Sequence, residues 1–340
     1  MNIFRSPNGN SVLFIAEVGG NHEGNFDYAK RLLDLALDSG ADFVKLQLYS
    51  ASGLVSPTED PNRHEHFKKF ELTKEQYIEL ANHCNSRKPG SFMASVWQES
   101  MFDWYNELTT IHKIGSGDLT NHPLIKKMVL TKKPIILSTG LSTLNQIEQT
   151  VSFIKSIDKS YISEKKLAIL QCTSSYPTPE NEVNLNSMNT IKQTLSLPVG
   201  YSDHTEDELA VETAVAMGAE IIEKHFTDVR EGKIFRDHKV SITCDELKKL
   251  LIKLKRIKNL QGNHVKLPTK SEIDQKHTIS FRKSVYANKD LNAGVILTEE
   301  DVTTLRPFTG ICASNFYMTI GKRINKALKK NDVIKDEHLS

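Results

Sequence analysis

Two histidines stand just beyond two apolar runs, and each lies in a short polar stretch. The first stretch, GYSDHT (residues 200–205), follows Leu197–Val199, and the second, EKH (223–225), follows Ala219–Ile222. Residues 207–218 between them have acidic residues first, an alanine-rich body and a final glycine, which is typical of a helix. The sequence therefore predicts strand, helix, strand, with a histidine leaving the C-terminal end of each strand.

Ligands of parallel α/β folds bind at the C-terminal ends of the strands. His204 and His225, so placed, can share one metal ion, with Ser202, Asp203, Glu223 and Lys224 at the same mouth. A single strand-end histidine is more often a surface or hydrogen-bonded residue than a ligand. The metal hypothesis therefore depends on the pair and its polar neighbours together.

Other apolar runs also carry polar residues. Glu17 interrupts VLFIAEV (12–18), and burial of a carboxylate is costly without a purpose or a partner. In FVKLQLY (43–49), Lys45 and Gln47 share one face of the predicted strand, which indicates a polar pocket inside a barrel. A phosphate or carboxylate ligand needs lysine charge with hydroxyl and N–H donors. Residues of these types stand at Lys45, Lys113, Ser116, Ser138 and Ser202. Each serine alone is as well explained as a turn or helix cap.

The elements that position these residues repeat as strand and helix. Further strands are predicted at 91–96, 111–115, 134–139 and 167–173, and helices at 26–39, 74–87, 99–108, 143–157, 186–195 and 244–260. Eight such units in about 260 residues have the size and rhythm of a (β/α)₈ TIM barrel. A doubly wound sheet is the alternative, but the chain lacks an initial GxGxxG and that fold usually has fewer units. Ala51–Phe70 is predicted to be a long loop without structure, either a functional lid or disordered.

The composition changes after Gln261. We predict a barrel domain at 1–262, a polar linker at 263–278 and a small module at 279–340, with short strands at SVYA, GVIL and YMTIG. The core of such a small module is marginal alone, so it is expected to pack on the barrel or on a partner subunit.

Charge and cysteine usage exclude several classes. The net charge of the 340 residues is +2, which argues against nucleic acid or a membrane surface as the partner. No apolar run approaches membrane-spanning length, and no signal peptide is evident at the N-terminus. The 4 cysteines lack CxxC spacing, so we expect reduced thiols in a cytoplasmic protein.

Seven motifs resemble the signature set of the sialic acid (N-acetylneuraminate) synthase family. They are AEVGGNHEG (16–24), VKLQ (44–47), KIGSGD (113–118), ILSTG (136–140), CTSSYPTP (172–179), GYSDHT (200–205) and EKHFT (223–227). FRKSVYANKDLNAGVILTEEDV (281–302) and RPFTGI (306–311) resemble the antifreeze-like (SAF) domain of that family. The resemblance runs in order along nearly the whole chain.

This resemblance implies an enzyme that condenses phosphoenolpyruvate with an N-acetylated hexosamine aldehyde and releases phosphate, giving a nine-carbon 2-keto-3-deoxy acid. It implies a divalent metal, Mn²⁺ or Mg²⁺, held by His204 and His225. By the same matching, phosphoenolpyruvate is bound by Lys45, Lys113, Ser116, Ser138 and Ser202, and the open-chain sugar by Glu17, Gln47, Asp118, Tyr176 and Asp237. It also implies a domain-swapped homodimer, in which Arg306 of one SAF domain, with Phe281 nearby, reaches the site of the partner subunit.

The chemistry agrees with these roles. A metal acting as a Lewis acid makes the aldehyde more electrophilic. A water molecule must attack C2 of the phosphoenolpyruvate unit, and either metal coordination or a carboxylate such as Glu223 or Glu17 can deprotonate it. The catalytic candidates are thus Glu17, His204, Glu223 and His225.

The chain departs from the family pattern near the predicted site. Where the family usually has Ser-Thr-Pro-Phe, residues 95–98 read SVWQ; Val96 has no side-chain donor, so a phosphate contact is lost or moved to Ser95. Ser174 stands where asparagine is common, Arg236 replaces a glycine before Asp237, and Phe308 replaces another. The reaction class stands, but the sugar is open. N-Acetylmannosamine is the first candidate, and a di-N-acetylated 6-deoxyhexose giving legionaminate or pseudaminate comes next.

Two other functions remain open. A non-catalytic carbohydrate-binding protein could keep the barrel, although a decayed enzyme would be expected to lose some of the polar residues above. A synthase of an eight-carbon acid would use a sugar phosphate, but no additional Arg/Lys cluster for a distal phosphate is evident.

Overall fold

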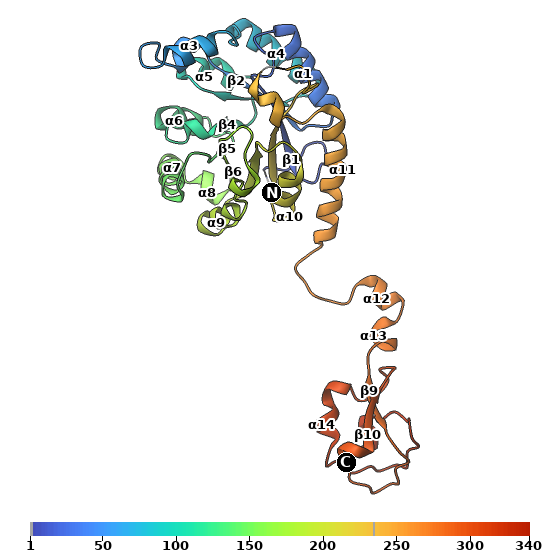
Figure 1. The fold of residues 1–340 in the computed structure, drawn as a ribbon. Helices are drawn as coiled ribbons and strands as arrows, with labels where there is room; N and C mark the ends of the chain where they lie inside the picture. The colour runs from blue at the N-terminus through green and yellow to red at the C-terminus, as the bar shows by residue number, and fades with distance from the viewer. Residues whose placement is uncertain (1–2, 234) are drawn as a thin grey trace. The chain divides into compact units, whose positions relative to one another are not determined.

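The computed structural model describes residues 3–233 and 235–340 (Figure 1). The chain divides into two units, Met1–Gly262 and Asn263–Ser340, which are described separately. Among the helices of these residues, none is both long and apolar enough to span a lipid bilayer.

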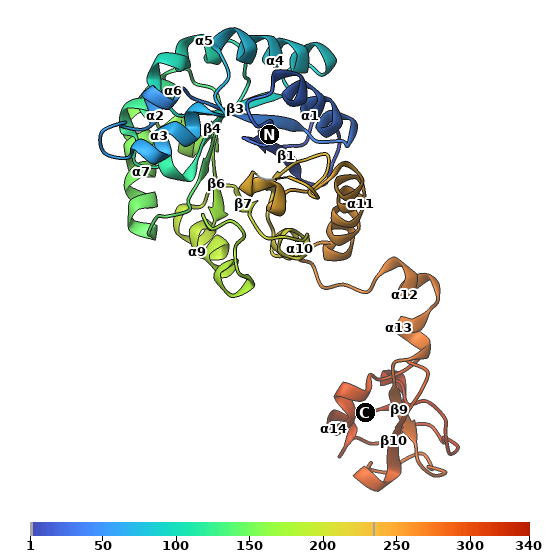
Figure 2. The same ribbon diagram turned by 45° about the horizontal axis from the view of Figure 1, so that its top comes forward.

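Eight parallel strands of the first unit form a closed barrel in chain order. They are β1 (Leu13–Gly19), β2 (Phe43–Leu48), β3 (Phe92–Val96), β4 (His112–Ile114), β5 (Ile135–Ser138), β6 (Leu167–Cys172), β7 (Val199–Asp203) and β8 (Ile221–His225). β1 pairs with both β2 and β8, which closes the ring. Figure 2 shows the helices arranged around these strands. The predicted TIM barrel is confirmed.

The surrounding helices have recognisable start signals. The longer ones are α1 (Phe26–Asp38), α4 (Lys74–Arg87), α6 (His122–Leu130), α7 (Leu144–Ile157), α9 (Asn186–Leu195), α10 (Leu209–Ala216) and α11 (Cys244–Gln261), and the short ones are α5 (Phe102–Asn106) and α8 (Ser160–Ser163). Thr73 and Thr143 each begin a helix with a capping box, in which a glutamine three residues later bonds back to the cap. α6 is absent from the predicted helices, although Asn121 caps it and Pro123 lies in its first turn.

The segment after β2 is helical, so the prediction of a structureless loop there was wrong. It contains α2 (Ala51–Leu54) and α3 (Pro61–Lys68). The side chains of Ser50 and Asp60 accept hydrogen bonds from backbone N–H groups in the first turns of these helices. α3 has no buried residue and no apolar stripe, which is why periodicity did not detect it.

His204 directly follows β7 and His225 is the last residue of β8, as predicted, but both strands extend beyond their apolar runs. They continue to Asp203 and His225 because their polar residues keep the regular alternation of a strand. Ser202 and Glu223 face the interior, whereas Asp203 and Lys224, which were predicted at the same mouth, face outward and pair with each other. Ser202, Glu223 and His225 therefore lie on strands rather than after them.

Strand side chains alternate between two apolar clusters. Val44, Leu46 and Leu48 of β2 belong to the cluster between the strands and the helices. The second cluster fills the barrel interior from the beginnings of the strands: Phe4, Leu13, Ile15, Phe43, Met93, Ile111, Ile136, Ala168, Leu170 and Ile221. The interior is thus a dry core where the strands begin.

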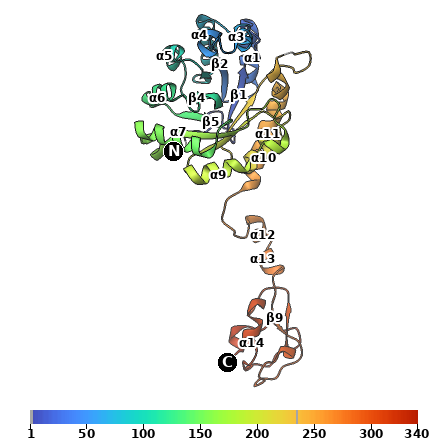
Figure 3. The same cartoon turned by 60° about the vertical axis from the view of Figure 1, so that its left-hand side comes forward.

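The second unit has a small core of its own around an antiparallel pair, β9 (Ser284–Ala287) and β10 (Val302–Leu305) (Figure 1). Its helices are α12 (Lys270–Asp274), α13 (His277–Ser280) and α14 (Phe316–Thr319). Figure 3 shows β9 from another side. The predicted strand SVYA is present as β9. The other two strand predictions were wrong: GVIL forms only an isolated bridge at Ile296, and YMTIG begins within α14. Short apolar runs do not distinguish strand from helix.

Candidate active site

On the barrel strands, the next inward-facing residues beyond the dry core are polar. Each of them comes two positions after an inward-facing apolar residue or glycine, and all of them are buried. They are Glu17, Lys45, Ser95, Lys113, Ser138, Cys172, Ser202 and Glu223. Because the strands are parallel and in register, these side chains form one polar layer at the C-terminal end of the barrel.

Lys45 is the centre of one half of this layer. Its Nζ lies 2.7 Å from Glu17 Oε2 and donates a 3.0 Å hydrogen bond to Ser95 Oγ. Gln47 Nε2 donates to the other oxygen of Glu17 at 2.8 Å. The Lys45 ammonium also lies 3.9 Å from Glu223 Oε2, which joins the two halves of the layer.

Lys113 is the centre of the other half. Its Nζ donates a 2.7 Å hydrogen bond to Ser138 Oγ and lies 3.3 Å from Glu223 Oε1. Ser202 Oγ donates to the same Glu223 oxygen at 3.0 Å. Glu223 therefore lies between two buried ammonium groups, each of which also contacts a serine hydroxyl.

The two glutamates have opposite electrostatics. Burial raises the pKa of Glu17 and outweighs the ammonium of Lys45. Burial acts on Glu223 in the same direction, but the charges of Lys113 and Lys45 overcome it and hold the pKa at about 2. Carboxyl groups whose pKa values are driven apart are a mark of acid–base sites. Glu17 is the one better able to accept a proton.

The two histidines face each other at the rim of this layer. The ring centroids of His204 and His225 are 5.4 Å apart. His204 Nδ1 lies 2.7 Å from the carbonyl oxygen of Thr173, which places the proton on Nδ1 and leaves Nε2 for a metal. Burial lowers the pKa of His225 to about 3, so its ring is neutral, and its buried Nδ1 has no hydrogen-bond partner among the described residues.

These features fit a pair of metal ligands. Within the described residues, no three His, Cys, Asp or Glu side chains converge as a metal-binding group. An ion on His204 and His225 would therefore take its remaining ligands from water or substrate oxygens, as Mg²⁺ does in many enzymes. The chemistry of the donor set suits a substrate-coordinating ion rather than a closed structural site.

Tyr176 and Asp237 lie next to the histidines. The ring of Tyr176 is 4.1 Å from that of His204, and the Arg236 guanidinium lies 4.1 Å from the Tyr176 ring. Asp237 Oδ2 lies 3.9 Å from His225 Nδ1, and Arg236 Nε donates to Asp237 Oδ1 at 2.8 Å. Arg236, one of the departures from the family pattern, thus contacts two predicted sugar-binding residues.

Ser116 and Ser174 meet across Gly140. Ser116 Oγ accepts a 3.0 Å hydrogen bond from the Gly140 N–H. A Cβ on Gly140 would lie 2.9 Å from Ser116 Oγ and 2.4 Å from Ser174 Oγ, so only glycine allows the two hydroxyls to approach here. Asp118 is more peripheral; burial raises its pKa, and it accepts a 3.2 Å hydrogen bond from Asn121.

Cys172, which the sequence predicts only to be a reduced thiol, belongs to the site. Its Sγ lies 3.9 Å from His204 Nδ1. Burial alone would raise the pKa of this thiol, but His204 lowers it, and the thiol in turn raises the pKa of His204 against the effect of burial. The inward alternation Ala168, Leu170, Cys172 was the signal that could have identified it.

The departure at residues 95–98 is explained by the same alternation. Ser95 points inward to Lys45, whereas Val96 packs in the outer cluster between strands and helices. A donor at position 96 would face away from the mouth, so the absence of one there removes nothing from the polar layer.

Arg306 and Phe281 lie in the second unit, where the Arg306 guanidinium is 5.6 Å from the Phe281 ring. Both side chains are exposed. Their role in the site of a partner subunit stays a prediction.

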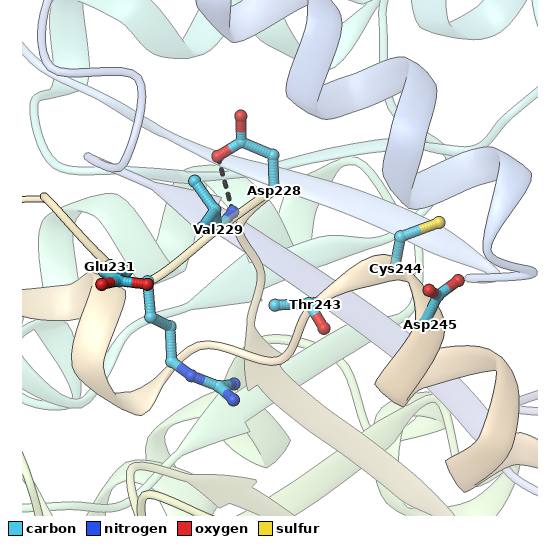
Figure 4. A pocket seen from close by; sticks show the side chains of 7 residues that line it. Asp228, Val229, Glu231, Thr243, Cys244 and Asp245 are labelled. Carbon is cyan, nitrogen blue, oxygen red and sulfur yellow. Dashed lines mark hydrogen bonds between the residues drawn. The ribbon is translucent and has the colours of Figure 1, made fainter.

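A hollow of about 390 Å³ lies elsewhere on the barrel unit (Figure 4). It is lined by Asp228, Val229, Arg230, Glu231, Thr243, Cys244 and Asp245, none of which belongs to the predicted site. The polar layer, and not this hollow, gathers the candidate residues.

Comparison with known proteins decides the family. Residues 32–266 match the model of the NeuB family, and residues 282–340 match that of the SAF domain. The chain belongs to the NeuB family.

Individual relatives cover most of the chain. It is 37% identical over 341 residues to an N,N'-diacetyllegionaminic acid synthase of Campylobacter jejuni, with 96% of this chain and 99% of that protein aligned. The synthase of the same name from Legionella pneumophila is 34% identical, with 98% and 96% covered. The crystal structure of an N-acetylneuraminic acid synthetase from Leptospira borgpetersenii matches with a TM-score of 0.71 and 31% identity over 79% of this chain and 91% of that one. This NeuB-family protein therefore resembles synthases of more than one sialic-acid-type product.

Proposed function

We propose that this NeuB-family protein condenses phosphoenolpyruvate, the open-chain form of an N-acetylated amino sugar and water to a nonulosonic acid and inorganic phosphate. C3 of phosphoenolpyruvate forms a bond to the aldehyde carbon, whose oxygen takes up a proton. Water adds to C2, and the C2–O bond to phosphate then breaks, leaving the 2-keto group. The observation that supports this most strongly is the buried layer in which Lys45, Lys113 and their serine partners surround Glu223.

The lysines supply charge for a trianionic substrate. Lys45 lies on β2 and Lys113 on β4. Each is hydrogen-bonded to a serine hydroxyl that can itself donate to a ligand oxygen. In a water-poor site such fixed charges stabilise developing negative charge without reorganisation. Ser116, Ser138 and Ser202 add donors around them.

Glu17 is our candidate for taking the proton of the attacking water. Its raised pKa makes it a stronger base than Glu223, which the two lysines keep ionised. Gln47 holds the second oxygen of Glu17 and so orients the carboxylate. Glu223 then serves to position the lysines and to balance their charge.

His204 and His225 would hold a divalent ion, Mn²⁺ or Mg²⁺. When bound, such an ion polarises the aldehyde carbonyl as a Lewis acid. Tyr176 and Asp237 lie beside the two ligands and are placed to orient the sugar near the ion.

For the acceptor we favour a di-N-acetylated 6-deoxyhexose, which would give legionaminate. The support comes from the two relatives named N,N'-diacetyllegionaminic acid synthase, at 37% and 34% identity over nearly the whole chain. N-Acetylmannosamine, the first choice from sequence, is the second candidate, because the 31% identical structure is an N-acetylneuraminic acid synthetase.

The test is phosphate release from phosphoenolpyruvate with Mn²⁺ and a panel of aldehydes. The panel holds a di-N-acetylated 6-deoxyhexose, N-acetylmannosamine, its 6-phosphate and arabinose 5-phosphate. The first should give the largest kcat/KM. No turnover with any of them would favour a carbohydrate-binding protein instead.

His225→Ala tests the metal assignment, with His122→Ala as the matched control. His122 is partly buried at the start of α6, where its ring stacks on that of Phe153 with centroids 4.1 Å apart. The His225 variant should lose metal-dependent turnover and Mn²⁺ binding, whereas the control should keep both. Full metal-dependent turnover in His225→Ala would refute the assignment.

We also propose that the protein works as a homodimer in which the SAF domain completes the partner's site through Arg306. Subunits carrying Arg306→Ala and subunits carrying His225→Ala should each be inactive and should recover activity when mixed and reassembled. Absence of recovery in a verified mixed dimer would contradict the exchange.

A further inference from the structure

Trp97 lies at the edge of the polar layer, directly after β3. Its ring stacks on Tyr49, with centroids 5.3 Å apart and planes 23° from parallel. Phe67 of α3 meets both rings edge-on, at 5.1 Å from Tyr49 and 6.0 Å from Trp97. Three segments far apart in the chain thus fix the plane of the indole.

This packing directs the indole N–H to the lysine layer. A Cβ built on Gly115 would lie 3.6 Å from Trp97 Nε1 and 3.8 Å from Ser95 Oγ. Gly115 continues the alternation of β4, in which Lys113 faces the interior and Ile114 the outer cluster. The N–H and the Ser95 hydroxyl therefore border the same space inside the mouth, which the missing side chain of Gly115 leaves open.

Trp97 is partly buried, and among residues 3–233 and 235–340 its indole N–H makes no hydrogen bond, although this nitrogen is not one of the fully buried unpaired polar atoms. Indole nitrogen is a donor only and usually finds a partner when it is buried. Its neighbour Ser95 Oγ already accepts from Lys45 Nζ. The donors around this space, an ammonium, a hydroxyl and an N–H, call for an anionic acceptor.

We propose that Trp97 is a substrate-binding residue whose indole N–H donates to a phosphate oxygen of phosphoenolpyruvate. The inference rests on the proposed function, since it takes phosphoenolpyruvate as the ligand. A phosphate group has three terminal oxygens, and Lys45, Ser95 and Trp97 supply one donor each from β2 and the end of β3. Phosphate recognition at the end of β3 thus depends on positions 95 and 97, while position 96 serves the outer core.

Trp97→Phe tests this without dismantling the aromatic contacts. Phenylalanine can stack on Tyr49 and Phe67 but lacks the N–H. Binding is measured by calorimetry without acceptor sugar, with phosphoenolpyruvate, inorganic phosphate and pyruvate as separate probes. Because a hydrogen bond to a charged group is lost, the Kd for phosphoenolpyruvate and for phosphate should rise roughly tenfold, and that for pyruvate should not change.

Two controls separate loss of the donor from loss of structure. Trp104→Phe changes the other tryptophan, which packs against the outer cluster, and should leave all three Kd values unchanged. Replacing the indole of Trp97 by the isosteric benzothiophene of 3-benzothienylalanine keeps the two-ring shape and should weaken phosphate binding as Trp97→Phe does. Thermal unfolding of each variant verifies that the barrel is folded.

Gly115→Ala approaches the same space from the opposite side. The added methyl would make only ordinary contacts, at 3.6 and 3.8 Å, and the Gly115 φ of −70° suits alanine, so the fold should tolerate it. The methyl would occupy the place of the ligand. We expect phosphoenolpyruvate binding to weaken more than roughly tenfold, with an unchanged unfolding temperature.

Failure of the proposed function and failure of the role of Trp97 give different results. If the unchanged protein binds neither phosphoenolpyruvate nor phosphate, the proposed function and this inference both fail. If it binds them and Trp97→Phe binds them equally well, only the role of Trp97 is refuted. A loss confined to pyruvate would overturn the phosphate contact and place the N–H on the carboxylate.

Discussion

The barrel contains two buried lysine–carboxylate networks at the ends of its strands, and they differ in how completely their hydrogen bonds are made. Lys224 points away from the interior and donates to Asp203, to the Thr205 carbonyl at 3.0 Å and to the Asp207 carbonyl at 3.0 Å. Asp203 also accepts from the Tyr201 hydroxyl at 2.8 Å and from the Thr205 N–H at 3.0 Å. All three protons of the ammonium thus have acceptors.

The inner network, the polar layer inside the barrel, is incomplete. Glu17 Oε2 lies 2.7 Å from Lys45 Nζ but has no aligned hydrogen bond within the described part of the chain, and the buried Glu223 Oε2 and His225 Nδ1 also lack one there. Buried polar groups are normally paired, and unpaired ones are expected where a ligand completes the set. We infer that the outer network fixes the loop that carries His204, while the inner one keeps capacity for substrate.

Removal of Lys224, the lysine of the outer network, should have the largest effect, which is a lower free energy of unfolding. Lys224→Met would leave Asp203 buried without a counter-charge, which costs about 3–5 kcal/mol. Urea unfolding measures this loss. The double variant Asp203→Asn/Lys224→Met should recover part of it, because no lone buried charge remains. A Lys224→Met protein within about 1 kcal/mol of the unchanged protein would show that the outer network is not structural.

Removing the inner lysine should act mainly on turnover. Lys45→Met takes one fixed donor from the mouth, and loss of such a donor costs about 10²–10³-fold in kcat, or roughly 2.7–4 kcal/mol. Its stability cost should be smaller than that of Lys224→Met, because Glu17 can take up a proton, as its raised pKa indicates. Phosphate release and urea unfolding on the same samples check both statements. Equal losses of stability in the two variants would erase the distinction between the networks.

Much of the fold follows from local patterns. Apolar runs of strand length alternate with amphipathic helices, and capping signals such as Thr73 with Gln76 mark where helices begin. The wrong predictions fall on segments whose secondary structure depends on tertiary contacts. α3 is held by Phe67 against Tyr49 and Trp97 rather than by an apolar stripe, and YMTIG has the composition of a strand but begins in α14.

The candidate site was predictable where period-two alternation applies. Lys45 and Gln47 read as one face of a strand in the sequence, and the structure brings both to Glu17. Trp97 could not be found in this way, because it lies beyond the strand and its orientation depends on Tyr49 and Phe67. The sequence also does not predict that Lys224 has a hydrogen-bond acceptor for each proton of its ammonium group. Two of these acceptors are backbone carbonyls of a loop.

Arg230 and Glu246 form a partly exposed ion pair at the surface of the barrel unit. Its removal should change the free energy of unfolding least. The hydrogen bond from Arg230 lowers the pKa of Glu246 from 4.5 to about 2 against the effect of burial, so the pair stabilises the fold fully above pH 4.5 and loses this contribution as the pH falls toward 2. Glu246→Gln should therefore lower the free energy of unfolding by less than about 1 kcal/mol near neutral pH, because exposed pairs are screened, and by nothing near pH 2. Unfolding measured across this range, with Arg230→Gln as the matched variant, tests the sign. A difference that grows as the pH falls would mean that Glu246 is stabilised in its protonated form, opposite to the geometry of the pair.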